Sequence, residues 1–169
     1  MSRPFVDPDL AAVTAALLTA HAEFVVIGGF AVIANDFVRA TEDVDFLIPD
    51  AAGNDRALDV ALAALDAHWL SPERPFAAGD LADREHSRLS TRAGLIDLLR
   101  EGAPPLDFAT VRGNAHEANL GAGRFHVAGL SSLVAFKRLA GRPRDKADLD
   151  ELREIHGELP IDPLPGLDS

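Results

Sequence analysis

The sequence predicts an α/β fold, because segments with the apolar spacing of helices alternate with short segments that have the spacing of strands. Two observations carry this prediction. An apolar run at residues 24–27 ends in a pair of glycines and lies between two helical patterns. Farther along, two strand-like runs flank a turn at residues 92–94. With 169 residues, 47% of them apolar, the chain suits one compact domain with its own core.

Helices and strands alternate in the first half of the chain. We expect, in order, a helix at 8–21, a strand at 24–27, a short helix at 31–36, a strand at 44–48 and a long helix at 54–68. The first helix has its apolar residues on one face and Asp7 or Asp9 as its N-cap. Four large apolar residues in a row indicate that the strand at 24–27 is buried.

The second half combines hairpins with helices, after a loop at 71–79 that is rich in proline and glycine. We expect a hairpin with arms at 87–91 and 95–99, a weaker hairpin at 116–127, and helices at 131–140 and 144–156. Ser131 or Ser132 is the expected N-cap of the first of these helices, and Gly157 ends the second. This order divides the chain into a core at 1–128, a helical part of the same domain at 129–157, and a flexible tail at 158–169.

Composition excludes several classes of function. The net charge of −11 disfavours broad, nonspecific binding of nucleic acid, which depends on many contacts from Lys or Arg to phosphate. The absence of cysteine excludes disulfides, thiolate metal sites and cysteine nucleophiles. The chain has neither an apolar run near the roughly 18 residues of a membrane-spanning helix nor the pattern of a secretory signal. We therefore expect a cytoplasmic protein without a membrane partner.

Cations are concentrated in two segments of this acidic chain. The first contains Arg84, Arg88 and Arg92, and a solvated face is the simplest interpretation of it. The second contains Lys137, Arg138, Arg142, Arg144 and Lys146. A functional role is favoured for the second segment, because both lysines of the chain lie in it.

Gly28 and Gly29 follow a strand and precede a short helix. Glycine lets the backbone approach a ligand closely, and N–H groups at such a turn favour an anion. A tight turn without any ligand is the alternative. The pair fits neither the GxGxxG pattern nor a phosphate-binding loop that ends in Lys-Ser or Lys-Thr.

Asp43 and Asp45 are the most informative feature for function. On a strand their side chains point to the same face, with Cα atoms about 7 Å apart. Two aligned carboxylates repel each other unless a cation joins them, and a divalent ion such as Mg²⁺ prefers oxygen ligands. A solvated surface is the alternative. Some phosphatases and sugar-nucleotide transferases also contain paired carboxylates, but there we expect the pair to close an apolar strand, whereas here it opens one.

Asp97 lies in the middle of an expected strand, between the apolar pairs Leu95-Ile96 and Leu98-Leu99. A buried charge is costly unless it is paired or binds a metal. The alternative is an aspartate that points outward from a strand whose neighbours point inward. If this strand lies beside Asp43 and Asp45, the three carboxylates converge and can hold two divalent ions roughly 4 Å apart.

These residues together resemble the nucleotidyltransferase superfamily of the DNA polymerase β type. The similarity rests on Gly28-Gly29, on the run Arg39-x-Thr41-x-Asp43-x-Asp45-Phe46, and on the strand-borne Asp97. It is greatest to the small prokaryotic branch that includes abortive-infection toxins and minimal nucleotidyltransferases. Residues 127–152 also resemble that branch, whose members often have a Lys-bearing helix followed by an Arg-x-Lys/Arg-Asp-x-x-Asp-Leu segment. The resemblance implies a nucleotidyltransferase fold, with a mixed sheet flanked by helices and a short C-terminal helical part.

The resemblance also implies roles for individual residues. Asp43, Asp45 and Asp97 would bind Mg²⁺ or Mn²⁺, and Asp97 would help to deprotonate the acceptor hydroxyl. Gly28 and Gly29 would cradle the triphosphate of a nucleoside triphosphate (NTP).

Further residues have an implied role and an alternative. Lys137 would contact the triphosphate, or it is a surface lysine that extends along an amphipathic helix. Arg39 and Thr41 would position phosphate, or they order the loop. Asp145 and Asp148 would contribute to the site, or Asp145 caps the last helix.

The implied reaction transfers a nucleoside monophosphate from an NTP to a hydroxyl of tRNA, a protein or a small molecule. A toxin role would imply an antitoxin protein as partner. Many members of the family have Gly-Ser where this chain has Gly28-Gly29, and others place Ser or Thr at the next position, where this chain has Phe30. That departure favours the alternative, a catalytically weak or inactive nucleotide-binding module of the same fold. A metal-dependent phosphohydrolase is a third interpretation.

Overall fold

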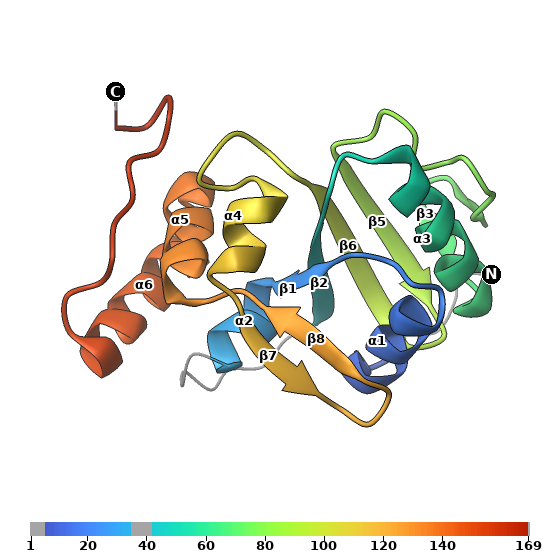
Figure 1. Cartoon of the computed structure of the whole chain (residues 1–169), viewed down its shortest axis with the longest axis horizontal. Coiled ribbons are helices and arrows are strands. Elements are labelled where there is room, and N and C mark those ends of the chain that lie inside the picture. Colours follow the sequence, from blue (N-terminus) through green and yellow to red (C-terminus); the bar gives the residue numbers. More distant parts are fainter. Residues whose placement is uncertain (1–5, 35–41, 169) are drawn as a thin grey trace.

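The computed structural model describes residues 6–34 and 42–168 (Figure 1). Its described helices are α1 Leu10–Thr19, α2 Gly28–Ala34, α3 Ala52–Ala64, α4 Phe108–Gly113, α5 Leu130–Ala140 and α6 Pro143–His156. Its described strands are β1 Val25–Ile27, β2 Asp43–Ile48, β3 His68–Leu70, β4 Glu73–Pro75, β5 His86–Thr91, β6 Gly94–Arg100, β7 His116–Asn119 and β8 Arg124–Val127. The predicted α/β order is confirmed.

The described strands form one mixed sheet in the order β4-β3-β5-β6-β2-β1-β8-β7. Strand β2 pairs parallel with β6 and antiparallel with β1, and β1 pairs parallel with β8. The helices α1 and α3 pack against each other on one side of the molecule, while α5 and α6 lie at the opposite side (Figure 1). Both predicted hairpins, β5-β6 and β7-β8, are present.

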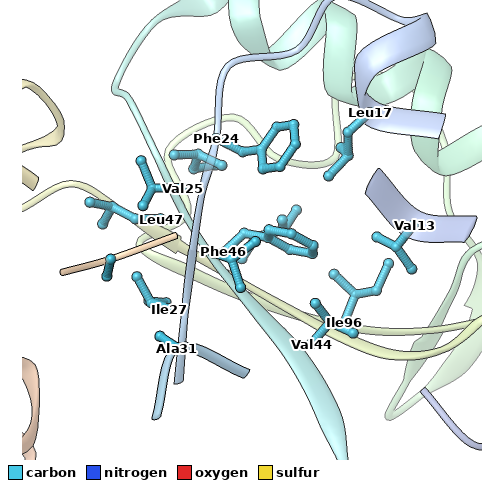
Figure 2. Close-up of a cluster of buried hydrophobic side chains, with 14 of the residues drawn as sticks. Val13, Leu17, Phe24, Val25, Ile27, Ala31, Val44, Phe46, Leu47 and Ile96 are labelled. Carbon is cyan, nitrogen blue, oxygen red and sulfur yellow. The ribbon is translucent and has the colours of Figure 1, made fainter. Parts of the chain in front are cut away.

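The alternation of side chains along β2 separates the core from the other face of the sheet. Val44 and Phe46 are fully buried, whereas Asp43 and Asp45, which alternate with them in sequence, are partly exposed. The Phe46 ring meets Phe24 edge to face with 5.4 Å between ring centroids. Val13 and Leu17 of α1 cover these rings (Figure 2). Burial of the apolar face therefore holds both aspartates on the opposite face.

Helix ends agree with the predictions at some positions and not at others. Asp9 caps α1, since its Oδ1 accepts a hydrogen bond from Ala12 N (3.0 Å), and Gly157 follows α6 as predicted. The serine cap predicted for α5 is wrong: the N-cap is Gly129, and Ser132 is buried inside the helix. Helix α2 begins at Gly28, three residues earlier than predicted.

The sequence patterns miss three short elements. β3 and β4 pair with each other at the edge of the sheet. β3 begins at His68, the last residue of the predicted long helix, and β4 lies inside the predicted loop at 71–79. Each has three residues, and β4 is exposed throughout, so neither displays an apolar period. The six-residue α4 is too short to show one.

The C-terminal segment follows α6 and lies along α5 (Figure 1). Leu159 and Leu164 are buried, and Leu164 packs with Leu106 and Ala135. Arg138 Nη2 lies 2.7 Å from Asp168 Oδ1. The flexibility of this tail in solution stays a prediction. Within the described ranges, every helix is too short or too polar to cross a membrane.

Candidate active site

A cleft of about 300 Å³ lies between the sheet and the two C-terminal helices. It is lined by the glycine turn, by β2, β5 and β6, by α5, and by the first turn of α6 with the residue before it. The predicted site residues that line it are Gly28, Gly29, Asp43, Asp45, Asp97 and Lys137. Arg39 and Thr41 lie outside the described residues.

The three predicted carboxylates converge in this cleft. Because β2 runs parallel to β6, Asp45 lies directly beside Asp97, and Asp43 lies on the same face two residues earlier. One oxygen of each residue lies within 4.8 Å of those of the other two. Asp97 is only 8% exposed, so the alternative of an outward-facing aspartate is wrong.

Burial and mutual repulsion disfavour the charged forms of Asp43 and Asp45. Burial, followed by the charges of Asp43 and Asp97, raises the pKa of Asp45 to about 8. Burial also raises the pKa of Asp43, against the opposing charges of Arg88 and Arg144. A cation bound between the carboxylates would relieve both effects.

The metal-free protein should therefore lose stability as the pH rises from about 4 to about 8. Folded Asp45 keeps its proton up to about pH 8, whereas an unperturbed aspartate releases it near 3.8. The folded state thus binds more protons than the unfolded state in this window, and stability falls with rising pH. Urea denaturation in EDTA at pH 5 and pH 8 measures the effect. Asp45→Asn should reduce the difference in the free energy of unfolding between the two pH values. If this difference were unchanged in Asp45→Asn, groups other than Asp45 would be its cause.

Gly28 is required by both its conformation and its surroundings. Its φ is +69°, a region that residues with side chains rarely adopt. A Cβ atom added at this position would collide with the carboxylate of Asp45. The glycine turn thus lies directly against the carboxylate cluster. Phe30 packs against the hydrophobic core.

Gly28→Ala should displace Asp45 and weaken divalent-metal binding at least tenfold, in addition to destabilising the fold by about 1 kcal/mol through backbone strain. Gly79→Ala is the matched control, because Gly79 has a φ of +91° but open space around it. Isothermal titration with Mn²⁺ and thermal denaturation separate the two effects. Equal metal affinity in both variants would show that contact with Asp45 is unimportant.

His86 and Arg88 of β5 belong to the site, although the sequence patterns did not identify them. His86 Nε2 lies 2.9 Å from Asp97 Oδ1. Arg88 Nη1 donates to Asp97 Oδ2 at 2.9 Å and to Asp43 Oδ2 at 3.3 Å. Arg88 is exposed, as expected for a solvated face, but it also contacts two of the three carboxylates. The hairpin register contained the missing signal, since the turn at 92–94 places Arg88 opposite Asp97.

Lys137 is buried at the wall of the cleft. Its Nζ lies 3.1 Å from Asp145 Oδ1 and 2.9 Å from Asp148 Oδ2, and the residue is 5% exposed. The surface-lysine alternative is wrong, while the predicted triphosphate contact stays a prediction.

Asp145 caps the last helix and also lines the cleft, while its contribution to the site stays a prediction. It caps α6 by accepting a hydrogen bond from Arg142 N at 3.1 Å, and it also pairs with Lys137. Burial alone would raise the pKa of Asp145, but hydrogen bonds from Arg142 and Lys137 outweigh burial and lower it. Arg142 and Arg144 line the cleft beside this carboxylate.

No protein-family model and no curated protein matches this chain in sequence. Solved structures match it in fold. The structure of ANT(2'')-Ia in complex with adenylyl-2''-tobramycin has a TM-score of 0.57 and 13% identity, and the match covers 86% of this chain and 86% of that chain. An antigenic nucleotidyltransferase-like protein from Paracoccidioides brasiliensis has a TM-score of 0.51 and 16% identity, over 86% of this chain and 75% of that chain. JHP933 from Helicobacter pylori has a TM-score of 0.51 and 18% identity, over 86% of this chain and 63% of that chain. The chain therefore has the nucleotidyltransferase fold.

Proposed function

We propose that this protein is a metal-dependent nucleotidyltransferase, which transfers a nucleoside monophosphate from an NTP to a hydroxyl and releases pyrophosphate. The observation that carries the proposal is the convergence of Asp43, Asp45 and Asp97 beside the glycine turn, in a cleft of a nucleotidyltransferase fold.

The three aspartates fit Mg²⁺ or Mn²⁺. They offer only oxygen ligands, their oxygens lie within 4.8 Å of one another, and their repulsion favours a bound cation. When bound, such ions stabilise the charge on the leaving pyrophosphate and lower the pKa of a coordinated hydroxyl.

The residues of the chain supply position and proton transfer. The acceptor oxygen attacks the α-phosphorus, the bond to the bridging oxygen of the pyrophosphate breaks, and Asp97 accepts the hydroxyl proton. Gly28 and Gly29 bring backbone N–H groups next to the phosphates. Lys137, Arg142 and Arg144 add positive charge to the same cleft.

The acceptor we favour is a small molecule with hydroxyl groups. A structural neighbour, ANT(2'')-Ia, forms a complex with adenylyl-2''-tobramycin. The net charge of −11 disfavours a large nucleic acid, although tRNA and protein hydroxyls remain part of the proposal. A toxin role and an antitoxin partner rest on the resemblance to the small prokaryotic branch, and a cytoplasmic location stays a prediction from the sequence.

Two measurements test the proposal. Calorimetry with ATP, GTP, CTP and UTP, with and without Mg²⁺, should show metal-dependent binding of at least one nucleotide. Incubation with that nucleotide, labelled at the α-phosphate, should then label an aminoglycoside, RNA or protein and release pyrophosphate. Tight binding without transfer to any acceptor would favour the nucleotide-binding module. Release of phosphate from simple esters would favour the phosphohydrolase.

A further inference from the structure

We propose that Arg88 is a positioning residue that competes with the divalent metal for Asp43 and Asp97, while also fixing the Asp97 carboxylate together with His86. The proposal rests on the proposed function, because it assigns those aspartates to the metal site. It adds a residue from a neighbouring strand that regulates how tightly the site holds its ion.

The strand register places this arginine where one side chain reaches two metal ligands. In the sheet order, β6 lies between β5 and β2. Arg88 of β5 is directly opposite Asp97 of β6, and its guanidinium extends past that residue to Asp43 of β2. Both of its contacts are to Oδ2 atoms, at 2.9 Å on Asp97 and 3.3 Å on Asp43.

His86 makes the second side-chain contact to the Asp97 carboxylate. It lies two residues before Arg88 and therefore on the same face of β5. Its Nε2 approaches Oδ1 of Asp97, so the two oxygens of this carboxylate contact different side chains. The side chain of Asp97 is 12% exposed, whereas those of Arg88 and His86 are 43% and 56% exposed. The two more exposed residues thus orient the buried carboxylate from the solvent side.

The positive charge of Arg88 acts on metal binding in two opposing ways. It offsets the repulsion among three carboxylates and so helps to keep them together. It also repels a divalent ion and shares the oxygens that such an ion would bind. We expect the repulsion and the sharing of oxygens to outweigh the first effect, so loss of Arg88 should strengthen metal binding. It should also slow the reaction, because Asp97 loses one of its two contacts. A residue with a purely structural role would weaken both.

The test measures Mn²⁺ binding by isothermal titration to the full chain after EDTA treatment. Arg88→Gln should bind Mn²⁺ about tenfold more tightly than wild type. Arg92→Gln is the matched control on the same hairpin, since Arg92 donates to the Ala64 carbonyl instead of the carboxylates, and it should match wild type. Transfer at saturating Mn²⁺ should show a lower kcat in Arg88→Gln only.

Unchanged or weaker Mn²⁺ affinity in Arg88→Gln would overturn the inference. Arg88→Lys, which keeps the charge but not the planar fork, should have an intermediate affinity, and it provides the test if Arg88→Gln fails to fold. An affinity of Arg88→Lys weaker than that of wild type would also overturn it. If wild type bound no Mn²⁺ at all, the proposed function itself would be contradicted. Binding without transfer would contradict only the enzymatic part and leave the affinity comparison decisive.

Discussion

Asp43→Ala and Asp45→Ala are each expected to abolish Mg²⁺-dependent NTP binding and to reduce transfer on the order of a thousandfold. Each change removes an oxygen ligand from a set whose oxygens lie within 4.8 Å of one another. A metal that stabilises the leaving group contributes several kcal/mol to the reaction, which corresponds to a loss of this size. Calorimetry with Mg²⁺ and NTP, followed by the labelled-nucleotide assay, measures both effects.

These variants should remain folded. Burial and the neighbouring charges disfavour the ionised carboxylate of Asp45 in the folded protein. Replacement of Asp45 should therefore leave the melting temperature in EDTA at pH 8 unchanged or higher. Asp50→Ala is the matched control, because Asp50 follows the same strand and is exposed. Full transfer activity in both active-site variants would refute the proposed function. Loss of activity in Asp50→Ala as well would show that the substitutions act through the fold.

Lys137→Met is expected to destabilise the protein by about 3–5 kcal/mol, whatever its effect on catalysis. Its Nζ is the cation between two buried carboxylates, Asp145 and Asp148. Removal of the lysine leaves these carboxylates buried without that partner, which costs far more than the loss of an exposed ion pair. Urea denaturation at pH 7 gives the free energy of unfolding.

The chain supplies two controls for this prediction. Lys146, the other lysine, is exposed, so Lys146→Met should change stability by less than about 0.5 kcal/mol. Adding Asp145→Asn and Asp148→Asn to Lys137→Met removes the two buried negative charges that faced the lysine and should recover much of the loss. If Lys137→Met raised only the KM for NTP and left stability intact, the predicted triphosphate contact would be the main role of this lysine.

Local patterns were sufficient for most of the elements around the site. The apolar run before Gly28, the alternation along β2 and the turn at 92–94 each lie within a window of a few residues. Their periodicity and turn chemistry therefore predicted β1, β2 and the β5-β6 hairpin. The same patterns failed for β3, β4 and α4, because elements of three or six residues are too short to show a period and depend on their neighbours.

Local sequence was enough to predict Asp43 and Asp45 on one face of a strand, a glycine pair before them and Asp97 on a later strand. The folded chain was needed to see that β6 lies parallel to β2, with Asp97 beside Asp45. It also shows that Arg88 reaches across two strands and that Lys137 is buried between two aspartates. The difference lies in how far apart in the chain the interacting residues are. Periodicity and turns arise from neighbouring residues, whereas strand order and the partners of long side chains depend on packing between segments far apart in the chain.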